Sequence, residues 1–173
     1  MGSRRFQPMI AGECRFLSHP FSNEWVLVQD GTRLATLRRH PRRHVSTVSL
    51  ESGSDFELQP QGWGTVVALE DGTERGRITR RSWWGRAWDL TSTTFGYELT
   101  SDFVPRRWTL RIGNEPVGRL AGTPFSYNRL RVHTDVAVPV LPLALAWHVL
   151  ARPWEAAAAP GTLVPPPILE SGA

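Results

Sequence analysis

The chain has 173 residues, a hydrophobic fraction of 40% and eight tryptophans, which suffice for one domain with a substantial core. A single cysteine, Cys14, excludes an internal disulfide and a cysteine-rich metal site. The net charge is +4 and every basic residue is an arginine, so nucleic acid, anionic lipid or an acidic protein are the partner classes that the charge favours.

Residues 1–22 are predicted to form a partly flexible lead-in, in which a strand is confined to Cys14–Leu17. This segment contains Arg4 and Arg5, but no apolar run of the length found in a signal peptide follows them. Without an export signal or disulfides, the expected location is the cytoplasm.

From residue 23 onward, short segments alternate polar and apolar side chains with period two, which is typical of half-buried strands. Asp30-Gly31, Asp71-Gly72 and Gly113-Asn114 separate pairs of these segments and predict two-residue hairpin turns, because primed turns require positive φ. Besides 14–17, the predicted strands are 24–29, 33–38, 45–50, 55–59, 64–70, 74–80, 83–90, 95–100, 107–112, 116–120 and 127–134.

A helix with apolar side chains on every side is predicted near the end of the chain, because no fully charged residue occurs between Asp135 and Arg152. Pro142 is compatible with its first turn, and Pro153 is expected to end it, which places the helix at about 140–151. A membrane span needs about 20 apolar residues, so this shorter helix is predicted to lie inside a protein core.

About twelve short strands in one antiparallel sheet would curl, split or close, and closure removes the exposed sheet edges. A barrel of that size is wider than the eight-stranded barrel, whose own side chains fill the interior. The predicted fold is therefore mostly β: a closed antiparallel barrel of about twelve strands around the C-terminal hydrophobic helix, spanning 23–154. Residues 155–173 are predicted to be a flexible tail rich in Ala and Pro.

Several short motifs precede the apolar helix in a characteristic order. They are Asp71–Ile78, Trp83–Trp88, Gly96–Leu99, Trp108–Leu110 and Val117–Leu120. In this arrangement residues 22–154 resemble the tubby-like superfamily, in its phospholipid scramblase-like and LURP-one-related branch. The resemblance implies a twelve-stranded barrel around a hydrophobic helix and an association with phosphoinositides or membranes.

Some features of the scramblase branch are missing from this chain. It has no Pro-rich N-terminal arm, no cysteine cluster for acylation and no clustered Asp/Glu loop for calcium. The resemblance therefore implies binding of an anionic headgroup, and it does not extend to scrambling or calcium dependence.

Arginines that neighbour one another or flank tryptophans are the candidate residues for binding an anionic ligand. Guanidinium forks bind phosphates bidentately, and tryptophan favours the headgroup layer. The candidates are Arg38, Arg39, Arg42, Arg43, Arg80, Arg81, Arg86, Arg106 and Arg107. The alternative is that these arginines are solvated loop charges whose stems cover packed tryptophans.

No catalytic constellation, nucleotide-binding loop or zinc spacing is present, so no enzymatic activity, cofactor or metal is predicted. His40 and His44 are separated by Pro41 and have no acid or cysteine nearby, which argues against a metal site. His148, in the apolar helix, is expected to be a core histidine whose ring N–H is bonded to a barrel carbonyl.

The expected function is therefore a non-enzymatic binding module that docks on anionic phospholipid headgroups, peripherally at the cytoplasmic membrane face and without a transmembrane span. One alternative is a nucleic-acid-binding β-barrel, which needs exposed aromatic side chains beside arginines on one face. Another is a protein-interaction scaffold. An enzyme with a pocket at the barrel mouth is a further alternative, but the sequence contains no assembled acid, base or nucleophile for it.

Overall fold

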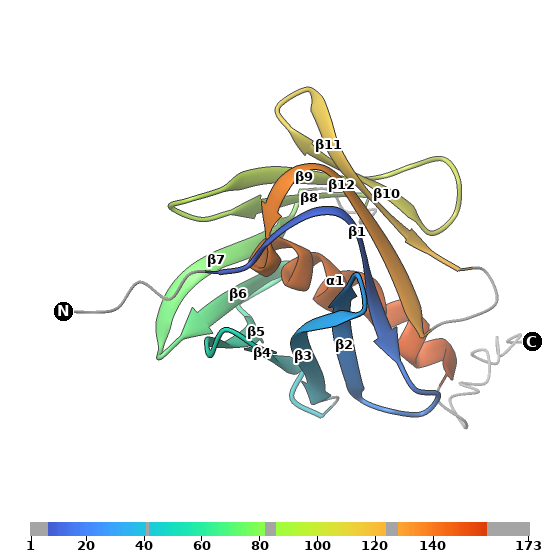
Figure 1. Cartoon of the computed structure of the whole chain (residues 1–173). Helices are drawn as coiled ribbons and strands as arrows, with labels where there is room; N and C mark the ends of the chain where they lie inside the picture. Colours follow the sequence, from blue (N-terminus) through green and yellow to red (C-terminus); the bar gives the residue numbers. More distant parts are fainter. Residues whose placement is uncertain (1–6, 41, 82–85, 124–127, 159–173) are drawn as a thin grey trace, which may run out of the picture.

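Twelve strands form a closed antiparallel barrel around one helix in the computed structural model, which describes residues 7–40, 42–81, 86–123 and 128–158 (Figure 1). The strands are β1 (Met9–Ser18), β2 (Glu24–Gln29), β3 (Thr32–His40), β4 (Val45–Leu50), β5 (Asp55–Pro60), β6 (Thr65–Glu70), β7 (Thr73–Arg80), β8 (Ala87–Thr91), β9 (Gly96–Ser101), β10 (Arg107–Ile112), β11 (Glu115–Gly122) and β12 (Arg129–Pro139). Helix α1 (Val140–Ala158) follows β12 directly. The predicted fold class is confirmed.

Each strand pairs with its neighbours in the sequence, and the barrel closes where β1 pairs with β12. The closing register runs from Met9 opposite Pro139 to Leu17 opposite Arg129. Closure leaves no unpaired strand edge, so the backbone N–H and C=O groups of every strand face a partner strand.

The barrel begins earlier than its predicted boundary at residue 23. Strand β1 starts at Met9, whereas only Cys14–Leu17 were predicted to be extended within the lead-in of residues 1–22. Burial alternates along the strand, but Met9 and Ala11 on its outer face are apolar, so the sequence shows no alternation of polar and apolar residues there. The register shift between Ile10 and Gly12 places its extra residues in β12, between Thr134 and Val138.

The two Asp-Gly turns adopt the conformation that their sequences predict. Asp30 and Gly31 have φ values of 49° and 77°, and Asp71 and Gly72 have values of 50° and 76°. Two successive positive φ angles define the type I′ turn, which matches the right-handed twist of the flanking strands. The third hairpin has positive φ only at its first central residue, Gly113, as in a type II′ turn.

Helix α1 starts where the proline pattern places it. Val140 donates its N–H to the carbonyl of Pro8 at 3.2 Å, and Pro142 lies in the first turn, where a missing N–H costs nothing. The predicted end near residue 151 is wrong, because the helix continues through Pro153 to Ala158. A proline inside a helix removes one hydrogen bond without preventing the next turn from forming.

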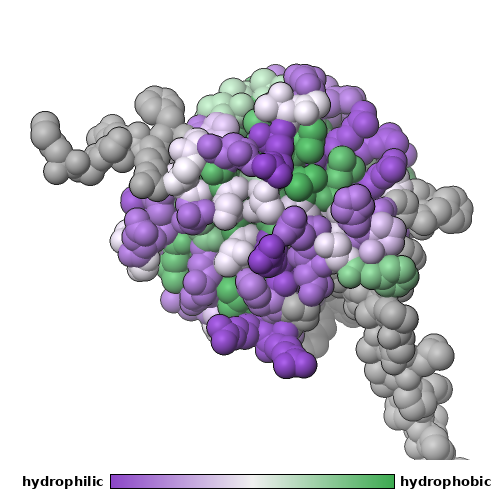
Figure 2. All heavy atoms as spheres, turned by 60° about the horizontal axis from the view of Figure 1, so that its bottom comes forward, coloured by the Kyte–Doolittle hydropathy of each residue, from purple (hydrophilic) through white to green (hydrophobic). Residues whose placement is uncertain are grey.

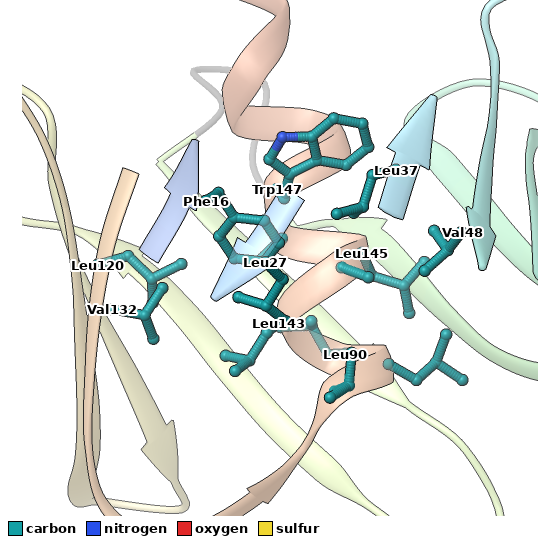
Figure 3. Close-up of a cluster of buried hydrophobic side chains, with 14 of the residues drawn as sticks. Phe16, Leu27, Leu37, Val48, Leu90, Leu120, Val132, Leu143, Leu145 and Trp147 are labelled. Carbon is teal, nitrogen blue, oxygen red and sulfur yellow. The ribbon is translucent and has the colours of Figure 1, made fainter. Parts of the chain in front are cut away.

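The described side chains of α1 are almost all buried, and the inward side chains of the barrel surround them. Trp147 stacks on Phe16 with ring centroids 6.3 Å apart and meets the edge of Trp25 at 5.9 Å. Figure 3 shows Leu145 on the same helix pointing toward the strand side chain of Val48. The absence of charge from residues 140–151 of the helix is therefore explained by the barrel wall that encloses them.

Four predicted segments fall partly outside the described residues. Residues 1–6 of the predicted lead-in and residue 127 of the strand predicted at 127–134 are not described. Of the strand predicted at 83–90, residues 83–85 are not described, and β8 covers Ala87–Thr91. Of the predicted tail at 155–173, residues 159–173 are not described. Within the described part of the chain, no helix is both long and apolar enough to cross a membrane.

The loops alternate between two ends of the barrel, because consecutive strands are antiparallel neighbours. The N-rim is the end at which α1 begins, and it carries the β2–β3, β4–β5, β6–β7, β8–β9 and β10–β11 loops. The C-rim is the opposite end, toward which α1 runs, and it carries the β1–β2, β3–β4, β5–β6, β7–β8, β9–β10 and β11–β12 loops. The contact between His148 on α1 and Ser46 at the start of β4 places the later part of the helix at the C-rim.

Truncating the helix core should destabilise the whole barrel. Leu145→Ala removes a completely buried side chain from α1, and we expect it to lower the free energy of unfolding by about 2–5 kcal/mol. Val136→Ala, at an exposed position of β12, should change it by about 0.5 kcal/mol or less. Urea denaturation of both variants measures the difference, and equal stabilities would contradict the enclosed helix.

Candidate functional site

All the candidate arginines lie at the C-rim or on the strand ends beside it. They come from three places in the sequence: the end of β3 and the β3–β4 loop, the end of β7 and the β7–β8 loop, and the β9–β10 loop with the start of β10. Strands β3, β7 and β9 all run toward the C-rim, so the residues after each of them reach the same end of the barrel. The topology thus brings together residues that are distant in the sequence.

The two rims differ in the sign of their loop charges. The described C-rim loops carry mainly arginines, namely Arg42, Arg43, Arg81, Arg86 and Arg106, with Asp102 as an acid among them. The N-rim loops carry Asp30, Glu51 and Asp71 and no arginine. An anionic partner would therefore be attracted to the C-rim and repelled from the loops of the N-rim.

Three arginines at the C-rim are available to a ligand. Arg42, Arg43 and Arg107 are exposed, and their side chains form no ion pair or hydrogen bond with another residue that the structure describes. A free guanidinium offers several N–H donors in a planar fork, which fits a phosphate or carboxylate.

Two other candidates are held by carboxylates on the outer face of the barrel. Arg38 pairs with Glu24 directly across the β2–β3 ladder at 2.7 Å. Arg81 contacts Glu98 at 2.5 Å and Asp89 at 2.6 Å. Hydrogen bonds to Glu98 and then to Asp89 raise the pKa of the Arg81 guanidinium above its ordinary value. These two side chains are less suited to capture a second anion.

The remaining exposed or half-buried candidates, Arg80, Arg86 and Arg106, lie in the C-rim loops or at a strand end beside them. Arg106 donates from Nη1 to the carbonyl of Thr123 at 2.7 Å and so links the β9–β10 and β11–β12 loops. Arg80 places its guanidinium 5.7 Å from the ring centre of Trp63, within the range of a cation–π contact. Arg86 is exposed in the β7–β8 loop.

Arg39 is not part of the accessible surface. It is 5% exposed and donates from Nη2 to the carbonyl of His148 on α1, at 3.4 Å. The reason is strand parity, because Arg39 shares the inward face of β3 with Ala35 and Leu37. Through this hydrogen bond Arg39 joins the middle of α1 to the barrel wall.

His148 is completely buried, as expected for a core histidine, but the ring contact differs from the predicted one. Its Nδ1 lies 2.8 Å from the hydroxyl of Ser46 on β4, where a backbone carbonyl was predicted. Ser46 is itself completely buried, so this pair places two polar groups within hydrogen-bonding distance inside the core.

Large apolar side chains at the C-rim were missed by the sequence reasoning. Phe21 is 80% exposed, Trp63 is 65% exposed, Val104 is 48% exposed and Phe103 is fully exposed. The sequence did contain an indication of this exposure. Trp63 lies between two glycines, in a turn where polar residues are usual. An aromatic residue in a turn belongs to no strand period, so the alternation pattern gave no indication of its exposure.

No metal centre can be built from the described residues, since no group of three or more His, Cys, Asp or Glu side chains among them is close enough to hold an ion. His40 ends β3, and His44 lies in the following loop with a φ of 55°.

The comparisons with known proteins give no further guidance on this site. No protein-family model, curated protein or solved structure matches the chain. The site is therefore defined by the geometry of the C-rim.

Removing the buried guanidinium should cost stability, whereas removing its exposed neighbour should not. We expect Arg39→Ala to lower the free energy of unfolding by about 1–3 kcal/mol, because the carbonyl of His148 loses a donor and the core loses packing. Arg42→Ala, from the adjacent loop, should change it by about 0.5 kcal/mol or less. Chemical denaturation measures both values, and a neutral Arg39→Ala would contradict the structural role.

The Cys14 thiol should be unreactive in the folded protein. Burial raises its pKa from 9.0 to about 12, so the thiolate fraction falls by about a thousandfold. We expect an aromatic disulfide reagent at about pH 8 to react far more slowly with the native chain than with the chain in urea. Because the folded pKa is raised, the protonated thiol stabilises the fold below pH 9 and this contribution is lost as the pH rises toward 12. Equal reaction rates in both states would contradict the burial.

Proposed function

We propose that this protein is a non-enzymatic module that docks peripherally on anionic phospholipid headgroups at the cytoplasmic face of a membrane, through the arginines of the C-rim. The observation that carries the proposal is the gathering of arginines from three separate parts of the chain at one end of a closed barrel. A flat anionic surface can meet all the loops of one rim at once, which a small soluble anion cannot do.

The charge distribution supports this orientation. Arginine and lysine side chains near an anionic membrane surface contribute about 1 kcal/mol each. Arg42, Arg43 and Arg107 are unpaired among the described residues, while acidic residues occupy the loops of the opposite rim. A barrel that docks through the C-rim therefore keeps its acidic loops away from the negative surface.

The architecture also supports the proposed membership of the tubby-like superfamily, in its scramblase-like and LURP-one-related branch. That resemblance implied a twelve-stranded barrel around a C-terminal hydrophobic helix, and the chain has this arrangement. Binding of an anionic headgroup is the property that the resemblance contributes to the proposal. Scrambling and calcium dependence are not part of it.

Loss of the unpaired arginines should weaken binding to anionic vesicles. For R42Q/R43Q/R107Q we expect an affinity about a hundredfold lower than wild type on phosphatidylcholine vesicles containing phosphatidylserine, measured by co-sedimentation at low salt. The wild-type affinity itself should fall at high salt, because ions screen the attraction between guanidinium groups and headgroups.

The matched control removes the same charge from the N-rim side. R33Q/R75Q/R111Q has the same net charge as the test variant, and its exposed or half-buried side chains lie in the N-rim halves of β3, β7 and β10. This control should retain wild-type binding. Equal losses in both variants would show that binding follows net charge alone, and no binding by the wild type would overturn the proposal.

A further inference from the structure

Exposed apolar residues and arginines share the loops of the C-rim. The β1–β2 loop carries Phe21, the β3–β4 loop carries Arg42 and Arg43, and the β5–β6 loop carries Trp63. Continuing around the barrel, the β7–β8 loop carries the arginines at 81 and 86, and the β9–β10 loop carries Phe103. Residues 82–85 of the β7–β8 loop and 124–127 of the remaining β11–β12 loop are not described. Figure 2, in which the bottom of Figure 1 comes forward, shows one side of the molecule, on which hydrophobic residues lie among hydrophilic ones.

The loop around Phe21 holds this side chain outward. The hydroxyl of Ser18 donates to the carbonyl of Glu24 at 2.8 Å, and the N–H of Ser22 donates to the carbonyl of His19 at 3.1 Å, so the base of the loop is closed. Phe21 itself has a φ of 66°, which is unusual for a bulky residue. Strained backbone of this kind is concentrated at functional sites, because the surrounding structure must hold it in place.

The β9–β10 loop presents Phe103 and Val104 in a similar way. The N–H of Asp102 donates to the carbonyl of Arg107 at 2.9 Å, and the hydroxyl of Thr109 donates to the carboxylate of Asp102 at 2.8 Å. These bonds close the loop beneath two adjacent apolar side chains, one of them fully exposed. Val104 has no aromatic face, so it cannot stack on a nucleobase, whereas it can enter hydrocarbon.

Trp63 completes the set of apolar loops. Gly62 and Gly64 on either side of it have φ values of 69° and 73°, and the N–H of Gln61 donates to the carbonyl of Thr65 at 2.9 Å. The ring is 65% exposed with the Arg80 guanidinium at its face. An indole beside a cation is the combination that settles at the headgroup layer of a bilayer.

We propose that the barrel docks end-on, with Phe21, Trp63, Phe103 and Val104 inserted into the interfacial layer of an anionic bilayer while the arginines of the intervening loops contact the headgroups. This inference rests on the proposed function and adds to it a hydrophobic contribution that salt does not screen. Insertion removes exposed apolar area from water, and the arginines of the same rim lie close enough to contact the headgroups.

Other exposed apolar residues of the described chain provide a control. Met9, Ile112 and Val136 lie in strands, in the half of the barrel that ends at the N-rim. They are far from the C-rim loops along their strands and should remain in water when the barrel docks end-on.

The first experiment compares matched triple variants on vesicles of phosphatidylcholine and phosphatidylserine. Phe21→Asn, which keeps a residue tolerant of positive φ, is combined with Phe103→Ser and Val104→Ser. We expect this variant to bind about a hundredfold more weakly than wild type, with the steepness of the salt dependence unchanged. The control, Met9→Thr with Ile112→Thr and Val136→Thr, should bind as wild type does.

The second experiment locates the loop directly. A polarity-sensitive dye on Phe103→Cys should shift to shorter wavelength on the same vesicles and be quenched by a nitroxide on the lipid acyl chains, while a dye on Ile112→Cys should do neither. The native Cys14 is buried and does not compete for the dye. Both variants are checked for a wild-type thermal transition before vesicles are added.

The outcomes separate this inference from the proposed function. If the arginine variant loses binding but the apolar variant and the dye at position 103 do not respond, insertion is overturned and headgroup binding stands. If the wild type binds no anionic vesicle, both proposals fail. If a single-stranded oligonucleotide displaces the protein from vesicles and quenches its tryptophans more strongly than the vesicles do, the C-rim is a stacking surface for nucleic acid and insertion is overturned.

Discussion

Enclosure of an uncharged helix by a closed sheet is the constraint on which the rest of this structure depends. From Val140 to Ala151 the helix presents apolar side chains in every direction, and a twelve-stranded wall is wide enough to receive them. Trp147, held between Phe16 and Trp25, shows how the first two strands and the helix share one packed core. Neither part could be stable without the other, because the barrel would be hollow and the helix would be exposed.

This packing also decides where a partner can bind. A closed barrel offers no free strand edge, so an extended peptide cannot add to the sheet. The outer face balances many of its charges internally, as in the pairs between Arg75 and Glu70 and between Arg77 and Glu74. Charge without a nearby partner therefore remains mainly in the loops. Because consecutive strands are antiparallel neighbours, the loops alternate between the two rims, and the loop charges of these rims are opposite in sign.

The architecture could be predicted from the sequence because two of its signals are local and strong. The Asp-Gly turns fixed hairpins, and the uncharged helix required an enclosing wall. The first strand was found only in part, because Met9 and Ala11 on its outer face are apolar and hide the alternation that identifies a strand. The helix extends past Pro153, since a proline disfavours continuation without forbidding it.

The candidate site was predictable in composition but not in exposure. The arginine clusters could be identified, but which of them face water depends on strand parity and on partners from distant strands. Arg39 illustrates parity, since the alternation of β3 places it with Leu37 on the inner face. Arg81 illustrates distant partners, because Asp89 and Glu98 approach it only after β7, β8 and β9 have paired. The exposed aromatic residues were missed for a related reason: a turn has no period from which the direction of a side chain can be derived.

The buried Arg39 shows how the core and the C-rim are connected. Arg39 donates to the carbonyl of His148, which lies ten residues before the end of the helix at Ala158. This contact uses none of the exposed arginines, so the positive charge of the C-rim loops is left for an external partner. The helix that fills the barrel is thus joined to an inward arginine at the end of β3, next to the loop that carries Arg42 and Arg43.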